Sequence, residues 1–256
     1  MGKIVSIVNQ KGGVGKTTTA VNLAAGIGLA GKKVLLVDAD PQGNSTSGYG
    51  ISKKAGGATS YELLIGAAKA ESAIIKTDFK NVDVIPASMN LAAAEVELVD
   101  IEHREAMLKN ALAPVRENYD YIFIDCPPSL GLITINALNA GDTVLVPIQC
   151  EYFALEGLSQ LMSSIRQIKR LYNPTLEIEG IVLTMFDGRL NLTQQVVGEI
   201  KKFFANKLYK TAIPRGVRLS EAPSHGLPIQ YYDKRSKGAV AYNDLAKEFI
   251  KRNKRG

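Results

Sequence analysis

Ten residues near the amino end, 9–18, constrain the fold of this chain more than any other segment. Their sequence is NQKGGVGKTT; they follow an apolar run at 4–8 and precede an alanine-rich helical pattern. A glycine-rich turn between a strand and a helix lets backbone N–H groups surround phosphate oxygens, because glycine tolerates close approach and unusual dihedral angles. The segment therefore predicts a phosphate-binding loop in an α/β fold.

The same loop contains candidate ligands of a nucleotide and its metal. Lys16 is expected to reach the β- and γ-phosphates, and the hydroxyl of Thr17 to ligate Mg²⁺. The usual pattern G-x-x-x-x-G-K-[ST] is altered, since Gln10 replaces the first glycine and an additional lysine, Lys11, lies inside the loop. A second ammonium needs a second anionic group, which a triphosphate shared between two subunits would supply. The predicted nucleotide-binding residues here are Lys11, Gly12, Gly13, Val14, Gly15, Lys16, Thr17 and Thr18.

Length and composition suit one α/β domain. The chain has 256 residues and 46% hydrophobic content, which allows a substantial core. Because no run of about 18 apolar residues and no signal-peptide pattern occurs, we expect a cytoplasmic protein. The chain begins at its first predicted strand, so we expect residues 1–256 to form a single domain without an amino-terminal helix-turn-helix.

Two lone cysteines, Cys126 and Cys150, show no C-x-x-C spacing and predict reduced core thiols. A metal or cluster assembled between two subunits is the less favoured alternative, since no further cysteine or histidine lies near either residue.

Short apolar runs alternate with longer helical patterns along most of the chain. The runs are rich in Val, Ile and Leu throughout, which is typical of strands covered on both faces. We therefore predict a doubly wound α/β fold, a mostly parallel sheet between two layers of helices, with ligands bound where strand ends meet helix starts. The predicted strands are 4–8, 33–37, 82–86, 121–125, 143–148, 181–185 and 209–213, and the predicted helices are 16–30, 91–117, 132–140, 155–172, 192–207 and 238–251.

Acidic residues follow two of the predicted strands. Asp38 and Asp40, in the sequence DADPQGN, place a carboxylate near an attacking water or a metal. Asp125 ends a later strand and precedes CPP, the arrangement expected of an acid that holds Mg²⁺. The predicted metal ligands are therefore Thr17 and Asp125, and the predicted cofactors are ATP and Mg²⁺.

Basic residues concentrate in the carboxyl-terminal third. Residues 1–165 carry 13 Lys and Arg against 17 Asp and Glu, whereas residues 166–256 carry 18 against 8. This third is the candidate surface for a polyanion. The alternative is that its lysines only solvate helix faces.

With these motifs in place, the chain resembles the ParA/MinD family of deviant phosphate-loop ATPases, and within it the short Soj-type ParA proteins of bacterial chromosome segregation. The resemblance runs the full length. It is carried by the loop, by residues 38–43 (DADPQG), by residues 125–129 (DCPPS) and by residues 213–223 (IPRGVRLSEAP).

The resemblance implies an ATP-hydrolysing enzyme in which two ATP molecules lie between the subunits of a homodimer. Lys11 and Lys16 would stabilise the transferring phosphoryl group, Lys11 from across the interface. Asp40 would help to place the hydrolytic water, and Gly12 would stay small for close subunit approach. Hydrolysis is expected to be slow until a partner completes the site. The adenine would lie against Pro214, Arg215, Gly216 and Val217.

Soj-type proteins bind double-stranded DNA without sequence preference once ATP has dimerised them, which implies a nucleoid-associated protein. Arg189 and Arg218 occupy the matching positions, although Arg189 capping a loop and Arg218 pairing with Glu221 are the structural alternatives. The family also implies a ParB-type centromere-binding partner that stimulates hydrolysis, and it allows a replication initiator as a further partner. The other basic residues expected to contact DNA are Lys201, Lys202, Lys234 and Arg235.

Three alternatives share these motifs. A MinD-like ATPase attaches to membranes through a terminal amphipathic helix, but the apolar positions 242, 245, 246, 249 and 250 are more simply the core face of the last helix, so we expect no membrane contact. A metabolic or electron-transfer relative would need cluster ligands or a substrate site that this sequence does not reveal. A ParA relative that positions another cargo would have nearly the same ATPase domain.

Overall fold

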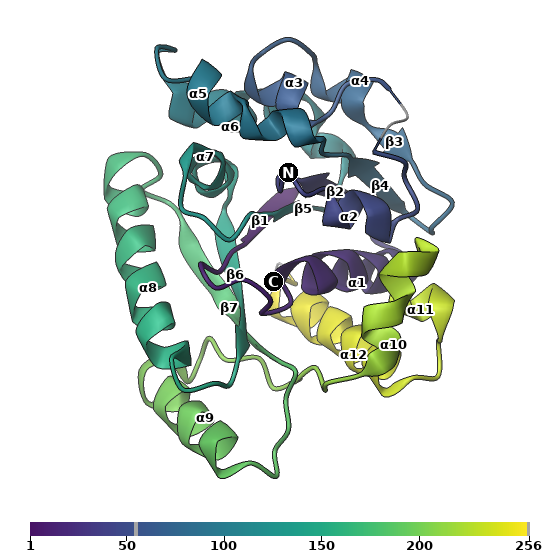
Figure 1. Ribbon diagram of the computed structural model, residues 1–256, viewed down its shortest axis with the longest axis vertical. Coiled ribbons are helices and arrows are strands. Elements are labelled where there is room, and N and C mark those ends of the chain that lie inside the picture. The colour runs from purple at the N-terminus through teal and green to yellow at the C-terminus, as the bar shows by residue number, and fades with distance from the viewer. Residues whose placement is uncertain (54–55, 255–256) are drawn as a thin grey trace.

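A single seven-stranded sheet forms the centre of the molecule (Figure 1). The structure, a computed structural model, describes residues 1–53 and 56–254. The strand order is β3-β4-β2-β5-β1-β6-β7, and every neighbouring pair is parallel except β3 with β4. This confirms the predicted fold class. The strands are β1 Lys3–Ile7, β2 Val34–Asp38, β3 Ile75–Lys76, β4 Val82–Ile85, β5 Tyr121–Asp125, β6 Thr143–Gln149 and β7 Glu177–Thr184.

Helices cover both faces of the sheet, and each layer has its own apolar core. One core includes side chains of α1, α11 and α12, and the other includes side chains of α3, α6, α7, α8 and α9. The helices are α1 Lys16–Leu29, α2 Asn44–Gly48, α3 Ser60–Leu64, α4 Ala70–Ala73, α5 Ala94–Glu97, α6 Met107–Leu112, α7 Leu132–Ala140, α8 Ala154–Leu171, α9 Asn191–Phe204, α10 Val217–Glu221, α11 Ile229–Tyr232 and α12 Lys237–Arg252, with 3₁₀ turns η1 Met89–Ala92, η2 Arg104–Ala106, η3 Ala113–Asn118 and η4 Ala222–His225.

The last helix, α12, packs its apolar stripe into the core, as predicted. Tyr242, Leu245, Ala246 and Phe249 are buried, and Ile250 packs partly against the same core. The approach to α1 is close, because a Cβ added at Gly26 would lie 3.0 Å from the Cβ of Ala246. Across the described residues, 1–53 and 56–254, no helix is both long and apolar enough to cross a bilayer.

Two predicted elements are wrong. The helix predicted at 91–117 is instead divided into the short helices α5 and α6 and 3₁₀ turns, because His103 adopts a left-handed backbone with φ of 57° and Pro114 cannot donate a backbone hydrogen bond. The strand predicted at 209–213 lies along β7 and forms only isolated bridges at Leu208 and Pro214. Between the bridges, the backbone N–H groups of Lys210 and Thr211 donate to the carboxylate of Glu248, each at 2.9 Å, instead of to a strand.

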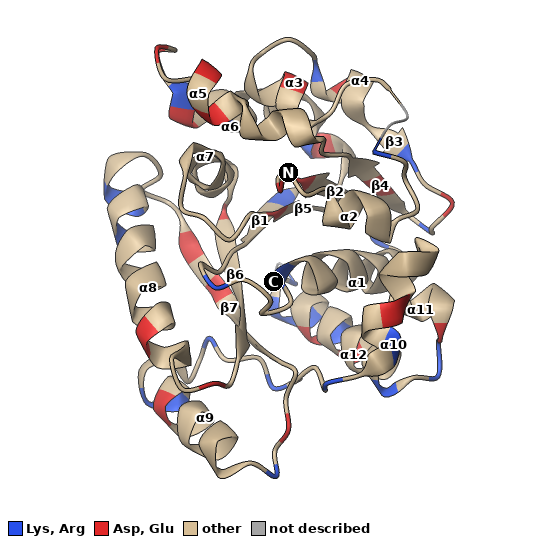
Figure 2. Ribbon diagram, in the orientation of Figure 1, with Lys and Arg blue, Asp and Glu red and all other residues tan. Residues whose placement is uncertain are grey.

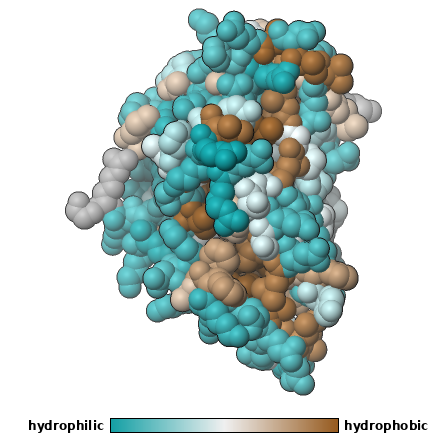
Figure 3. Space-filling view, turned by 90° about the vertical axis from the view of Figure 1, so that its left-hand side faces the viewer, coloured by the Kyte–Doolittle hydropathy of each residue, from teal (hydrophilic) through white to brown (hydrophobic). Residues whose placement is uncertain are grey.

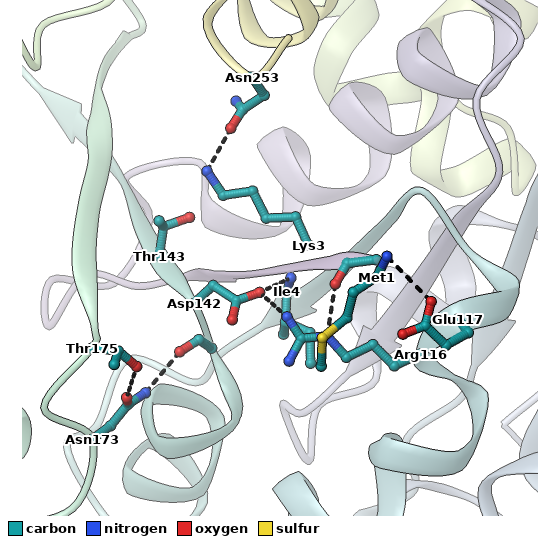
Figure 4. Close-up of polar contacts among 12 residues, drawn as sticks. Met1, Lys3, Ile4, Arg116, Glu117, Asp142, Thr143, Asn173, Thr175 and Asn253 are labelled. Atoms are coloured by element: carbon teal, nitrogen blue, oxygen red, sulfur yellow. Dashed lines mark hydrogen bonds and ion pairs between the residues drawn. The ribbon is translucent and has the colours of Figure 1, made fainter. Parts of the chain in front are cut away.

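A partly buried ion pair joins strands of the sheet at their amino-terminal ends. The carboxylate of Glu179 accepts hydrogen bonds from Lys3 at 2.5 Å, Asn253 at 2.7 Å, Tyr209 at 3.0 Å and Thr143 at 3.0 Å. Lys3 also donates to the side chain of Asn253, as Figure 4 shows. One carboxylate therefore joins β1, β6 and the end of α12 to β7.

We predict that Glu179→Gln lowers the free energy of unfolding by about 3 kcal/mol at neutral pH, because the Lys3 ammonium loses its counter-charge in a largely buried site. Burial acts to raise the pKa of Glu179, but the hydrogen bonds and charge of its partners outweigh it, so the folded-state pKa is lowered. A lowered pKa stabilises the fold above the unfolded value of about 4.3 and ceases to do so as pH falls through the folded value.

Urea unfolding of both proteins across this acid range measures the difference, which should shrink as pH falls below about 4. The matched control is Glu177→Gln, which removes an exposed pair with Lys169 and should cost less than about 1 kcal/mol. Equal costs for the two variants would show that the buried pair does not stabilise this edge.

Candidate nucleotide-binding site

The predicted phosphate loop lies between β1 and α1 and has the expected backbone. Gly13 and Gly15 adopt left-handed conformations with φ of 73° and 86°. Gly15 is the residue immediately before α1, so the loop runs directly into the N-terminus of a 14-residue helix. The unpaired N–H groups and dipole of that end favour phosphate.

Two hydrogen bonds hold the loop to neighbouring strands, and a third lies within the loop. The side chain of Asn9 donates to the Pro147 carbonyl at 2.7 Å and accepts from the Lys11 backbone at 3.0 Å. The Thr184 hydroxyl donates to the Val14 carbonyl at 2.7 Å. The ends of β6 and β7 therefore fix the loop from the side, a role of Asn9 and Thr184 that the sequence analysis missed.

The two lysines of the loop have different environments. Lys16 is buried and donates to the Lys11 carbonyl at 3.2 Å, and burial lowers its pKa although the carboxyls of Asp125 and Asp40 oppose the shift. Lys11 is exposed, and its ammonium pairs with Glu151 in the turn after β6. Only Lys16 therefore lies inside the site of its own chain.

The strand register brings the acidic residues together. Asp125 pairs with Ile7 of β1 on one side and with Asp38 of β2 on the other. The strands β1, β2 and β5 therefore end side by side. Asp38 accepts hydrogen bonds from the Thr46 backbone and hydroxyl, both at 2.7 Å. Both oxygens of Asp38 are engaged, because the Asp40 backbone donates to the other one at 3.2 Å.

Asp125 retains a free oxygen. Its Oδ2 accepts from the Ser45 hydroxyl at 2.8 Å, whereas its buried Oδ1 has no hydrogen-bond partner among the described residues. Burial and the adjacent Asp38 raise the pKa of Asp125, while the nearby hydroxyls of Thr17 and Ser45 oppose the shift. A buried carboxylate oxygen without a donor, close to a threonine hydroxyl at the start of α1, suits a hard cation such as Mg²⁺.

Asp40 lies two residues after Asp38, just beyond the end of β2. It is 8% exposed, and its Oδ1 accepts from the Gln42 backbone at 2.9 Å. The charge of Asp40 acts to raise the pKa of Lys16, so the predicted acidic group lies near the buried loop lysine.

The segment predicted to contact adenine, 214–217, begins beside the carboxyl-terminal end of β7. Pro214 bridges to Phe186, which follows β7 two residues after Thr184. Gly216 precedes α10, and the Val217 side chain is 73% exposed. The segment therefore presents one exposed apolar side chain, that of Val217.

The six basic residues predicted to bind DNA are divided between two places (Figures 1 and 2). Arg189 lies before α9, is 89% exposed and forms an ion pair with Asp187 at 2.7 Å. Arg218, on α10, pairs with Glu221 at 3.0 Å, as the structural alternative for this residue predicted. Water screens exposed ion pairs such as these, so they do not prevent a phosphate contact. Lys201 and Lys202 lie on α9, the helix that follows Arg189. Lys234 and Arg235 immediately precede α12.

One cavity lies away from the loop. About 910 Å³ in volume, it lies at the amino-terminal edge of the sheet, opposite the loop. Its basic side chains Lys3 and Arg116 already pair with Glu179 and Asp142, and Figure 4 shows the second of these pairs. Both cysteines are free thiols, Cys126 buried and Cys150 partly so.

The loop, the strand-end carboxylates and the parallel sheet define a phosphate-loop nucleotide-binding protein. A family model described as an AAA domain matches residues 2–178. The chain is 60% identical to the sporulation initiation inhibitor protein Soj of Bacillus subtilis over 97% of this chain and 98% of that protein. It is 52% identical to the chromosome-partitioning ATPase Soj of Treponema pallidum over 99% of each. The chain therefore belongs to the Soj/ParA family of chromosome-partitioning ATPases, as its motifs indicated.

A solved structure agrees with this fold. Cobyrinic acid a,c-diamide synthase from Mycobacterium smegmatis, with bound ADP and magnesium, superposes with a TM-score of 0.85 at 34% identity, covering 98% of this chain and 95% of that chain.

We predict that Thr184→Val weakens binding of ADP with Mg²⁺ about fivefold, because the Val14 carbonyl loses its donor and the loop loses a fixed support. Isothermal titration calorimetry measures the change. The control is Thr175→Val, which removes a hydroxyl that donates to Asn173. Both residues precede the start of β7, far from the loop, so the affinity should be unchanged. Equal affinities for wild type and Thr184→Val would contradict a supporting role for this hydroxyl.

Proposed function

We propose that this protein is a nucleotide-switched DNA-binding ATPase: ATP joins two copies into a dimer, the dimer binds DNA without sequence preference, and a ParB-type partner stimulates hydrolysis and releases it. One observation carries the proposal. The loop has two features that face away from its own site: the exposed ammonium of Lys11, which pairs with Glu151 outside the loop, and an uncovered glycine, Gly12. A Cβ added at Gly12 would meet nothing within 4 Å, so packing within its own chain does not require a glycine there, which supports close approach of a second copy.

Within such a dimer, each residue has a defined task. The loop amides and Lys16 would bind the β- and γ-phosphates, while Thr17 and Asp125 would hold Mg²⁺. The metal, when bound, would neutralise phosphate charge and orient the oxygens for in-line attack. Asp40 would position water at the rim, and Lys11 would leave Glu151 for the γ-phosphate of the opposite subunit.

DNA binding would follow from dimerisation. Dimerisation doubles the number of basic side chains that reach phosphates, and each contact releases counterions. Affinity should therefore rise with ATP and fall steeply with salt.

The competing functions have weaker support. A MinD-like membrane attachment needs a free apolar helix face, whereas the stripe of α12 is packed against the core. A biosynthetic ligase shares the fold, but the higher identities are to the partitioning proteins. A ParA-like protein for a different cargo would have the same DNA-binding cycle. A replication initiator would be a further partner of the same ATP-dependent dimer.

We predict that Asp40→Ala abolishes hydrolysis while ATP still binds, so that the protein stays on DNA. Anisotropy of a labelled random duplex should show tight, salt-sensitive binding with ATP and none with ADP. Lys16→Ala, which should lose the nucleotide itself, serves as the control and should not bind in either state. Undiminished turnover by Asp40→Ala, or equal duplex binding with ATP and ADP, would contradict the proposal.

We further predict that Arg189→Glu weakens duplex binding by about tenfold or more and lowers the salt slope, while ATP-driven dimerisation is unchanged. Arg166→Glu on α8 makes the same charge change at another exposed position and should have a smaller effect. Loss of both dimerisation and DNA binding in Arg189→Glu would assign that residue a structural role through its pair with Asp187.

A further inference from the structure

Two consecutive hydroxyl side chains, Ser45 and Thr46, lie inside the molecule against the two buried carboxylates of the site. Both residues are fully buried and belong to the short helix α2, which begins soon after Asp40. The outer face that carries α8, by contrast, shows hydrophobic residues in separate areas among hydrophilic ones (Figure 3), as is usual for a folded domain. A buried hydroxyl is the more specific feature, because its burial has to be compensated by a hydrogen bond.

The two hydroxyls serve different strands. Ser45 donates to Oδ2 of Asp125, at the end of β5, over 2.8 Å. Thr46 donates to Oδ2 of Asp38, at the end of β2, over 2.7 Å. Consecutive side chains of a helix diverge by about 100°, so one turn of α2 can reach two neighbouring strand ends. The two carboxylates belong to residues paired across the sheet, and α2 therefore holds both of them at once.

The contacts of Thr46 are explained by the fold alone. Its backbone N–H donates to the same Asp38 oxygen at 2.7 Å, and its hydroxyl also accepts from the Ala87 backbone at 3.0 Å. These bonds satisfy buried polar groups around Asp38. The side chain of Ser45 is different, because among the described residues it makes one hydrogen bond, and that bond goes to Asp125.

This single bond determines which oxygen of Asp125 is left over. The torsion that turns a carboxylate group is broad, so a donor on one oxygen fixes the position of the other. With the Ser45 hydroxyl on Oδ2, the remaining oxygen, Oδ1, is buried and has no hydrogen-bond partner among the described residues. The serine therefore holds Oδ1 in one place, available to a cation.

The helix that carries the serine is itself fixed at both ends. The Tyr49 hydroxyl, just after α2, donates to the Val21 carbonyl at 2.9 Å. Val21 lies on α1, the helix that also contains Thr17. Before α2, the backbone N–H of Gly43 donates to the Asp40 carbonyl at 2.8 Å. The serine hydroxyl is thus held in a defined position relative to the first turn of α1 and to the end of β2.

We propose that Ser45 is a positioning residue for the metal: its hydroxyl holds Asp125 in the rotation that presents Oδ1 to the Mg²⁺ bound with the nucleotide. Ser45 acts through Asp125 and is not itself a ligand. The inference rests on the part of the proposed function that assigns Mg²⁺ to Thr17 and Asp125, and it is independent of dimerisation and DNA binding. Residues that orient a metal ligand typically contribute about tenfold or more to metal affinity.

The test measures the affinity for ADP twice by isothermal titration calorimetry, with saturating Mg²⁺ and with excess EDTA. The ratio of the two affinities is the metal gain, the factor by which Mg²⁺ strengthens nucleotide binding. Ser45→Ala should lower the metal gain about tenfold. It should leave the affinity in EDTA unchanged, because the phosphates are bound by the loop and not by α2. A serine that only supported the fold would instead lower both affinities by the same factor.

Ser47→Ala is the matched control. Ser47 lies on the same helix, but its hydroxyl donates to the Gly43 carbonyl at 3.2 Å instead of to a carboxylate. The same atom is removed in both variants, so the metal gain of Ser47→Ala should equal that of wild type. Ser45→Cys keeps the size of the side chain with only a weak donor and should also lose most of the metal gain. It provides the measurement if the alanine variant does not fold.

Asp125→Asn separates this inference from the proposed function, because it removes the charge of the metal ligand itself. We expect it to abolish most of the metal gain. If Asp125→Asn loses the gain and Ser45→Ala keeps it, the metal assignment stands and the positioning role of Ser45 is wrong. An unchanged gain in Asp125→Asn would contradict the metal assignment and the inference together. Equal losses in Mg²⁺ and in EDTA for Ser45→Ala, or failure of both Ser45 variants to fold, would make Ser45 a structural residue.

Discussion

The parallel pairing of β5 with β1 and β2 is the constraint on which the site depends. It sets Ile7, Asp38 and Asp125 in one row, so the phosphate loop and two buried carboxylates leave the sheet at the same level. Two carboxyls side by side in the interior repel each other, and burial penalises their charge. Asp38 is compensated by the Thr46 and Asp40 donors, whereas Asp125 has an oxygen left over for a cation.

The rest of the architecture keeps this row in place. At the opposite edge, Glu179 ties Lys3 and Asn253 to β7 and so anchors the start of β1 and the end of α12. At the site edge, Thr184 and Asn9 fasten the loop to β7 and β6. Different contacts hold the two ends of these strands: a partly buried ion pair at the amino-terminal ends, and hydrogen bonds to backbone carbonyls at the carboxyl-terminal ends.

Local patterns were enough to predict much of this. The loop glycines, the strand-end acids and the α12 stripe are each visible in a few neighbouring residues, because they follow from backbone conformation and helical period. Contacts between distant residues were not predictable. Nothing near Thr184 indicates that its hydroxyl meets Val14, and nothing near Glu151 indicates that it pairs with Lys11. The errors at 91–117 and 209–213 have a similar cause, since a left-handed His103 and the distant carboxylate of Glu248 override local propensity.

The central claim is that the nucleotide site is completed by a second copy of the chain. Sedimentation of the Asp40→Ala protein with ATP and with ADP, alongside the same protein carrying Gly12→Val, tests it most directly. The glycine is suited to this because its own chain leaves room for a side chain. We predict a dimer with ATP, a monomer with ADP, and a monomer in both when Gly12→Val is present although ATP still binds. A monomer with ATP, or an unaffected dimer in the Gly12→Val protein, would contradict the claim.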